Sequence, residues 1–431
     1  MKIFLKALLI TIVFTGSVFA ETFMSALKRA YETNPELNAE RENLNISEQE
    51  LNISKGSYLP TVTLSGSKSQ EDTDKLTNRS GANAAITDVD PTVKSITITQ
   101  TLIDFGRGAE LAKSKIGIDL AEAKLLKKEQ EILYKSIEAY TGLISTNEKL
   151  KINRSNVNLL DRQVETDKAR LERGQITISD LAQSESSLAG AKAKYIEAKN
   201  DVTTSLLIYN NVIGSINNPK DLIENPNFKF DIPKSLGAAS DISKNKNPKL
   251  IIARLEYQQA EKDILIAKSD LYPSASLSFE ASQTEDFSSS YDEKDKKVLK
   301  ATIKWPFYSG GKNKAKFEKN NTIKYQKKLL LDNTIKTSNT EVASVWSNFQ
   351  SSKSLLDSVK LQVRAAEIAN EGITVEYESG LGRTTLDVIQ SNTLLLDSKI
   401  SLANSERNYL LSQFKLLQSI GLLTSEYLKI K

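Results

Sequence analysis

The side chains available for chemistry are carboxylates, amines and hydroxyls, because the 431 residues include no Cys and no His. Thiol catalysis and Ser-His-Asp catalysis are therefore excluded, and most metal sites are disfavoured. The 54 Asp and Glu residues lie mostly at helix-surface spacing, which favours a solvated face over a catalytic pair. The sequence has no Gly-rich phosphate-binding motif ending in Lys. We expect no enzymatic activity, no cofactor and no metal.

Two aspartates nevertheless stand at matching places. Asp180 follows Gly174 and Asp387 follows Gly380, and each aspartate precedes a long helical pattern. Such a residue could cap the helix by accepting hydrogen bonds from open backbone N–H groups. If copies of the chain met on a symmetry axis, Asp387 could instead form a ring of carboxylates that attracts cations. The residues alone leave both interpretations open.

These turns belong to an internal duplication. Asn34-Pro35-Glu36-Leu37 returns as Asn247-Pro248-Lys249-Leu250. At matching places the two halves share further landmarks: Arg41 and Arg254, Glu48 and Glu261, Pro60 and Pro273, Gly106 and Gly311, Gly214 and Gly421. Landmarks that recur in one order indicate a repeated structural unit. We expect repeats at 21–215 and 241–422, a linker at 216–240 and a short tail at 423–431.

Each half changes its hydrophobic period from helical to alternating at a proline. Helical patterns over about 22–57 and 241–270 end at Pro60 and Pro273, since proline disfavours helix in the residue before it. Alternation then predicts strands at about 61–67, 93–104, 274–281 and 298–308, with Lys68–Pro91 and about 282–297 as polar loops. Leu277, Phe279 and Ile303 would face lipid, and Ser276, Ser278 and Thr302 water. A small soluble sandwich is the alternative on the strands alone.

Long helices follow the strands. Residues 107–173 contain no Pro and would form a rod of about 100 Å at 1.5 Å per residue. Apolar residues recur every seventh position there and in the two shorter helices that follow the turns: Leu143, Leu150, Val157, Val164, Leu171; Leu181, Leu188, Tyr195, Val202, Tyr209; Val388, Leu395, Leu402, Tyr409, Leu416. Such spacing predicts coiled-coil seams. A second stripe beside the last one indicates packing on two neighbours, as in a closed cylinder of helices, although heptads alone also fit an ordinary bundle.

The first 20 residues have the features of a secretory signal peptide. Lys2 and Lys6 precede a short apolar core, and Val18-Phe19-Ala20 is a small-x-small cleavage site. The apolar core is shorter than the roughly 20 residues that span a bilayer. We expect an exported chain without a spanning helix. Its formal net charge of +4 becomes +2 without the two lysines, which argues neither for nor against nucleic acid.

In this order and duplication, the motifs resemble those of the TolC-like outer-membrane efflux proteins. The shared features are the Asn-Pro-x-Leu openings, the Pro60 and Pro273 junctions, Gln100 to Gly106, and the turns that carry Asp180 and Asp387. The resemblance implies a mainly α fold in which long helices form a periplasmic α-barrel. It implies that each protomer of a homotrimer gives four strands to one 12-stranded outer-membrane β-barrel. It also implies an exit duct for type I protein secretion or multidrug efflux, with a periplasmic adaptor and an inner-membrane ABC or RND-type pump as partners, and no nucleic acid.

The resemblance assigns site residues to the periplasmic tip. Asp180, Tyr377 and Arg383 match members of a network that holds the channel closed. Asp387 matches the first of two acidic rings in the pore, and Gln390 occupies the place of the second. The turn between Gly380 and Asp387 is one residue longer than the turn between Gly174 and Asp180, which makes the match of Arg383 less exact.

A periplasmic coiled-coil adaptor or a structural protein of an export complex is the alternative function. An adaptor would carry one long hairpin flanked by soluble β domains. In this sequence the coiled coil is duplicated and interleaved with amphipathic strands, which favours the channel.

Overall fold

The structure is a computed structural model that describes residues 21–72, 74–75, 77, 79–82, 88–216, 222, 231–288 and 291–430. The expected signal peptide at 1–20 lies outside the described residues, as does most of the expected linker.

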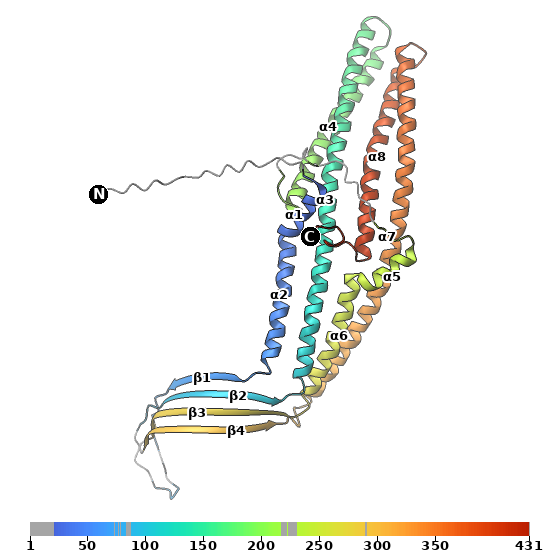
Figure 1. Ribbon diagram of the computed structural model, residues 1–431. Coiled ribbons are helices and arrows are strands. Elements are labelled where there is room, and N and C mark those ends of the chain that lie inside the picture. The colour runs from blue at the N-terminus through green and yellow to red at the C-terminus, as the bar shows by residue number, and fades with distance from the viewer. Residues whose placement is uncertain are drawn as a thin grey trace, which may run out of the picture. The chain divides into compact units, whose positions relative to one another are not determined.

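Within the described residues, twelve elements follow one another: α1 (Phe23–Thr33), α2 (Pro35–Gly56), β1 (Thr61–Lys68), β2 (Thr92–Ile103), α3 (Arg107–Glu172), α4 (Ile178–Val212), α5 (Leu236–Lys246), α6 (Pro248–Ser269), β3 (Ser274–Ser288), β4 (Tyr291–Lys304), α7 (Lys312–Glu378) and α8 (Thr385–Ser419) (Figure 1). The order α-α-β-β-α-α occurs twice, so the internal duplication is confirmed.

Two compact units divide the chain, and each unit takes segments from both repeats. The sheet unit comprises residues 36–128 and 239–342, and so contains all four strands. The helical unit comprises the described parts of Met1–Pro35, Glu129–Ala238 and Ala343–Lys431. Helices α3 and α7 contribute residues to both units.

Each opening helical segment is two helices, because the Asn-Pro motif interrupts it. The side chain of Asn247 caps α6 by accepting a hydrogen bond from the backbone N–H of Lys249, 2.9 Å away. Pro248 occupies the first helical turn, where its missing N–H costs nothing. The buried Asn247 amide also donates to Ser338 Oγ at 3.1 Å, which attaches this cap to α7. The duplicated motif is therefore a helix start.

The strands begin where the prolines predicted. β1 starts at Thr61 and β3 at Ser274, each one residue after its proline. The strands form one antiparallel sheet in the order β1-β2-β3-β4, visible side by side in Figure 1. Central pairs such as Ile98 with Phe279 join the two repeats.

The expected loop at 282–297 is wrong, because β3 continues to Ser288 and β4 begins at Tyr291. β3 lies between two partner strands, and its backbone stays paired with β2 as far as Glu285 even though its side chains have become polar. Main-chain hydrogen bonding thus extends the hairpin beyond the apolar alternation. At the other end β4 stops at Lys304, not at 308, since Pro306 has no N–H to donate to a ladder.

Packing within the helical unit is centred on aromatic and aliphatic side chains from both repeats. Tyr140, Tyr209 and Phe414 are fully buried, and Phe23 contacts Tyr140 edge-on with ring centroids 5.1 Å apart. Farther along, the predicted seam joins α3 to α4 through a small cluster: Leu160, Val164, Leu188 and Ala191, flanked by Val157 and Leu181. Among the residues described, the helices include none both long and apolar enough to cross a membrane.

The short C-terminal tail after α8 is packed into the helical unit. Leu423, Leu428 and Ile430 are buried. The backbone N–H of Ser425 donates to Glu129 Oε1 at 2.5 Å, and the Tyr427 hydroxyl donates to the carbonyl of Asp231 at 3.2 Å. These contacts secure the end of the chain against α3.

Candidate functional site

The sheet has two chemically different faces. The register places Leu277 opposite Ala301 and Ala275 opposite Ile303, so Leu277 and Ile303 share one face, while Ser276 and Thr302 pair on the other. The first face carries large apolar residues from all four strands: Val62, Leu64, Ile96, Ile98, Leu277, Phe279, Leu299 and Ile303. Leu64 and Ile303 are 78% and 79% exposed, which a sheet in water would not favour. The alternation predicted from the sequence is confirmed, and the apolar face is suited to lipid.

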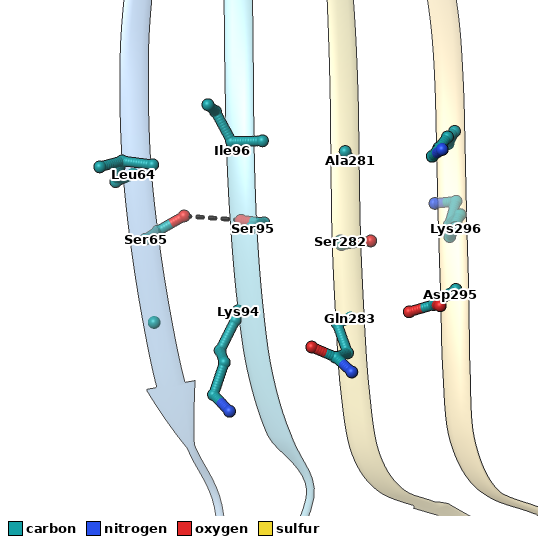
Figure 2. A pocket seen from close by; sticks show the side chains of 12 residues that line it. Leu64, Ser65, Lys94, Ser95, Ile96, Ala281, Ser282, Gln283, Asp295 and Lys296 are labelled. Atoms are coloured by element: carbon teal, nitrogen blue, oxygen red, sulfur yellow. Dashed lines mark hydrogen bonds between the residues drawn. The ribbon is translucent and has the colours of Figure 1, made fainter.

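The apolar face ends in a row of polar residues near the turn end of the sheet. Figure 2 shows Leu64, Ile96 and Ala281 beside Lys94, Gln283 and Asp295 of the next row. On the other face Ser65 and Ser95 are joined by a hydrogen bond of 2.8 Å. The hollow that these residues line is open and crosses all four strands, so it is not an enclosed pocket.

Aromatic residues gather where the sheet meets the helices. Trp305, Phe307 and Tyr308 are 60%, 83% and 84% exposed. Trp305 is held in place by a hydrogen bond of 3.2 Å from its indole N–H to the Leu271 carbonyl and by edge-on contact with Phe307. Tyrosine and tryptophan are enriched at membrane–water interfaces, so this cluster marks one limit of the apolar band.

In the helical unit, the turns between α3 and α4 and between α7 and α8 share one construction. Thr177 caps α4 and Thr384 caps α8, and each threonine forms a capping box with the aspartate three residues later. The Thr177 N–H donates to Asp180 Oδ2 at 2.9 Å, while the Asp180 N–H donates to Thr177 Oγ1 at 3.2 Å. The distances for Thr384 and Asp387 are the same. The cap residue is thus threonine, and both aspartates stand at the third helical position.

These hydrogen bonds stabilise the ionised aspartates. The backbone N–H and then the hydroxyl of Thr177 lower the pKa of Asp180 below its ordinary value. The same two groups of Thr384 lower the pKa of Asp387, with a smaller contribution from the positive charge of Arg383. Both carboxylates therefore stay charged at neutral pH.

Arg383 and Gln390 lie on either side of Asp387 in sequence. The Arg383 Nε donates to Glu376 Oε2 at 2.6 Å, and this hydrogen bond raises the guanidinium pKa. Both partners are more than two-fifths exposed. Gln390 is exposed on α8, three residues after Asp387 and hence on the same side of the helix.

Tyr377 is buried, and its hydroxyl donates to Asp167 Oδ1 of α3 at 3.0 Å. Within one chain, Asp180, Tyr377 and Arg383 therefore bond to three different partners: Thr177, Asp167 and Glu376. Whether they meet between protomers stays a prediction.

Asp167 is the centre of a polar network that the sequence interpretation missed. Its carboxylate is fully buried and accepts from Tyr377, from Ser184 Oγ at 2.5 Å and from Gln163 Nε2 at 3.0 Å. Thr385 Oγ1 lies 3.0 Å from the Tyr377 hydroxyl, and the Arg170 guanidinium lies over the Tyr377 ring at 4.2 Å. The network joins the α3–α4 hairpin to the α7–α8 hairpin. A sequence signal existed: Leu160 and Asp167 are seven residues apart, which puts a carboxylate on a coiled-coil seam.

Comparison with known proteins agrees with this arrangement. The outer membrane efflux protein BepC of Brucella suis biovar 1 (strain 1330) is 24% identical over 97% of this chain and 90% of its own. TolC of Salmonella enteritidis is 22% identical over 94% of this chain and 83% of its own. The crystal structure of the Campylobacter jejuni CmeC outer membrane channel superposes with a TM-score of 0.82, at 16% identity, over 93% of this chain and 86% of that one. This likeness shows that the fold is that of an outer-membrane channel.

The model of one family, described as outer membrane efflux protein, matches residues 26–214 and again 240–422. The two matches coincide with the two structural repeats seen above. The chain belongs to the outer membrane efflux protein family of the bacterial outer membrane.

Proposed function

We propose that the protein is one protomer of a homotrimeric outer-membrane channel that passes cargo without transforming it. The observation that carries this proposal is the four-stranded sheet with a lipid-compatible face, a polar face and two edges, β1 and β4. A sheet that spans a bilayer must close, since unpaired backbone groups in hydrocarbon cost several kcal/mol each. Four strands cannot close, whereas three copies give twelve.

We infer that the channel works with a periplasmic adaptor and an inner-membrane ABC or RND-type pump. Membership of the family supports a channel in export, and the name of BepC supports efflux. Type I protein secretion is the second possibility for the same duct, supported by the TolC-like motifs of the two turns. A closed barrel and the two helical hairpins are compatible with the passage of small molecules and of secreted proteins alike.

We place the periplasmic gate at the two turns of the helical unit. Asp180, Tyr377 and Arg383 form the proposed closing network, and Asp387 and Gln390 the proposed constriction. Two ionised aspartates and one arginine there support an electrostatic latch, because carboxylate and guanidinium can form charge-assisted hydrogen bonds. Replacing Asp387 with Asn should lower the preference of the channel for cations over anions, as read from the reversal potential.

Cysteine cross-linking tests the trimer, since the natural chain contains no Cys. Cysteines on the edge strands, at Thr63 of β1 and at positions from Val298 to Thr302 of β4, should give disulfide-linked trimers in native membranes. A matched control is Ser65→Cys with Ser95→Cys, because these side chains already meet within one chain and should give monomers only. A product limited to monomers in every edge pair would contradict the trimer. A water-soluble monomer without conductance would favour an adaptor or structural protein instead.

A further inference from the structure

The polar face of the sheet carries a row of lysines. The side that contains Ser276 and Thr302 also contains Lys294, Lys296, Lys300 and Lys304 of β4. The hairpin is paired from Ser274 with Lys304 to Thr284 with Lys294. Within this stretch, the same side of the sheet has one acidic residue, Glu280. Four lysines and one glutamate give a formal charge of +3 on this face (4 − 1). Asp286 and Asp292 lie beyond these pairs, at the turn end.

The opposite face of the same stretch is neutral. It carries Asp295 and Lys297, whose charges cancel, among the apolar residues. In this stretch of the β3–β4 hairpin the net positive charge is therefore confined to one side, whereas Lys68 of β1 and Lys94 of β2 lie on the opposite side of the sheet. We call the positive side of the hairpin the lysine face.

The ammonium groups of the lysine face are available. Among the residues that the structure describes, no ion pair involves Lys296, Lys300 or Lys304, while Lys94 of the other face bonds to Glu285 at 2.7 Å. The Lys294 ammonium lies over the Phe287 ring, 4.0 Å from its centroid, a contact that leaves its charge intact. The neighbouring strands place serine side chains on this face, including Ser65, Ser95, Ser278 and Ser282. The Ser65 and Ser95 hydroxyls bond to each other, and the Ser278 hydroxyl donates to the Lys300 carbonyl, so the lysine ammonium groups are the main attraction for an anion.

The spacing makes the charge continuous along the strand. Lys296, Lys300 and Lys304 are four residues apart, or about 13 Å at 3.3–3.4 Å per residue. Every point between two of them lies within about 7 Å of an ammonium, which is less than the Debye length of about 8 Å at physiological ionic strength. In low salt, or in a narrow lumen, the fields overlap further.

We propose that the lysine face is an anion-attracting wall of the channel lumen, which favours the passage of negatively charged solutes, such as carboxylates, over positively charged ones. The proposal rests on the channel function given above. Its sign is opposite to that of the Asp387 constriction, so the sheet unit and the helical unit select for different charges.

A single introduced thiol measures the local potential. Thr302→Cys puts one cysteine between Lys300 and Lys304 on the same face, in a chain that otherwise has none. The ratio of its reaction rates with an anionic and a cationic methanethiosulfonate reagent should fall roughly fivefold or more when Lys300 and Lys304 become Gln. The matched control is Lys94→Gln with Lys297→Gln, which removes the same charge from the other face and should leave the ratio unchanged. An equal change in both double variants would overturn the proposal.

Selectivity is measured in planar bilayers under a KCl gradient. In an Asp387→Asn background, Lys296→Gln with Lys300→Gln and Lys304→Gln should shift the reversal potential toward cation preference. Lys68→Gln with Lys94→Gln and Lys297→Gln removes three lysines from the opposite face and should not shift it. Identical reversal potentials for the two triple variants would overturn the anion-attracting lumen. Wild-type protein that never conducts would instead count against the channel, even if the thiol ratio still depended on Lys300 and Lys304.

Discussion

The phenol of Tyr377 donates a hydrogen bond to the carboxylate of Asp167, 3.0 Å away, and joins α7 to α3 at a buried position. The two residues are 210 positions apart and come from different repeats. A motion that separated the two hairpins would break this bond and leave a buried carboxylate with one donor fewer. The pair therefore opposes such a motion from within a single chain.

Tyr377→Phe should destabilise the protein by about 1–3 kcal/mol, because the buried Asp167 loses a donor while the ring still fills its place. Asp167→Asn should cost a similar amount. The double variant should cost less than the sum of the two single variants, since they remove one shared interaction. Thermal unfolding of all three measures the coupling. Strictly additive losses would show that the hydrogen bond contributes nothing.

Arg383→Ser should increase the resting conductance of the channel if Arg383 forms a latch between protomers. The structure supplies a control, since Glu376 is the partner of Arg383 within the chain. Glu376→Gln removes that partner and leaves Arg383 charged, so channels formed by this variant should conduct at rest about as much as wild type. Equal conductance in both variants, with trimers intact, would assign the effect of Arg383 to its own chain. Wild-type conductance in Arg383→Ser would remove this residue from the gate.

The capping boxes should make stability depend on acid pH. Asp180 and Asp387 have lowered pKa values in the folded protein, whereas an unfolded Asp titrates near 3.9. The unfolded state thus binds more protons as the pH falls through about 4, and the contribution of both groups is present above that value and lost below it. Asp180→Asn with Asp387→Asn should lower the melting temperature at pH 7 and flatten its decline between pH 5 and pH 3. Thr177→Ala, which removes the cap itself, should cost about 1 kcal/mol at neutral pH. An unchanged pH profile in the double aspartate variant would contradict this assignment.

Arginine scanning distinguishes the faces of the sheet. Leu277→Arg should destabilise the membrane-inserted protein by about 2–4 kcal/mol, because the charge would enter the lipid near the midplane. Ser276→Arg, one residue earlier, points to the polar face and should cost much less. Unfolding from lipid vesicles in urea provides the comparison. Equal losses at the two positions would contradict a lipid-facing apolar side.

Gly106 lies where no side chain fits. A Cβ at this position would lie 2.5 Å from Ser269 Oγ and 3.2 Å from Ser269 Cβ. Gly106→Ala should therefore cost about 1–3 kcal/mol through overpacking. Ser269→Ala removes the nearer atom and should recover part of the loss in the double variant, as measured by thermal unfolding. Gly108, two residues later, has open space around it, so Gly108→Ala is the control.

The parts of the fold that could be predicted from the sequence are those set by residues that act on their own stretch of backbone. Pro60 and Pro273 fix the helix-to-strand boundaries through backbone geometry, and alternation fixes which side of a strand is apolar. The length of the β3–β4 hairpin could not be predicted from the sequence, since the pairing of β3 depends on β2, which lies far away along the chain. Likewise the polar composition of 282–297 is typical of a loop, although backbone hydrogen bonds hold it as strand.

The candidate site was predictable in part for the same reason. The repeated motifs located both turns and both aspartates. The helix caps themselves are threonines, and the sequence pattern did not show whether the threonine or the aspartate caps each helix. The bond between Tyr377 and Asp167 joins two repeats across the fold, so no local pattern could pair them. Asp167 was visible only as a carboxylate on an apolar seam.

The join between the repeats runs down the middle of the sheet, where β2 pairs with β3. The first repeat alone can form only the β1–β2 hairpin, and isolated two-stranded hairpins are marginally stable. The partner of Ile98 is Phe279, 181 positions later, so the central ladder has a high contact order and forms slowly. Until the second repeat is available, the amphipathic β1–β2 hairpin therefore lacks the strand that completes the middle of the sheet, and its apolar side stays uncovered by the fold.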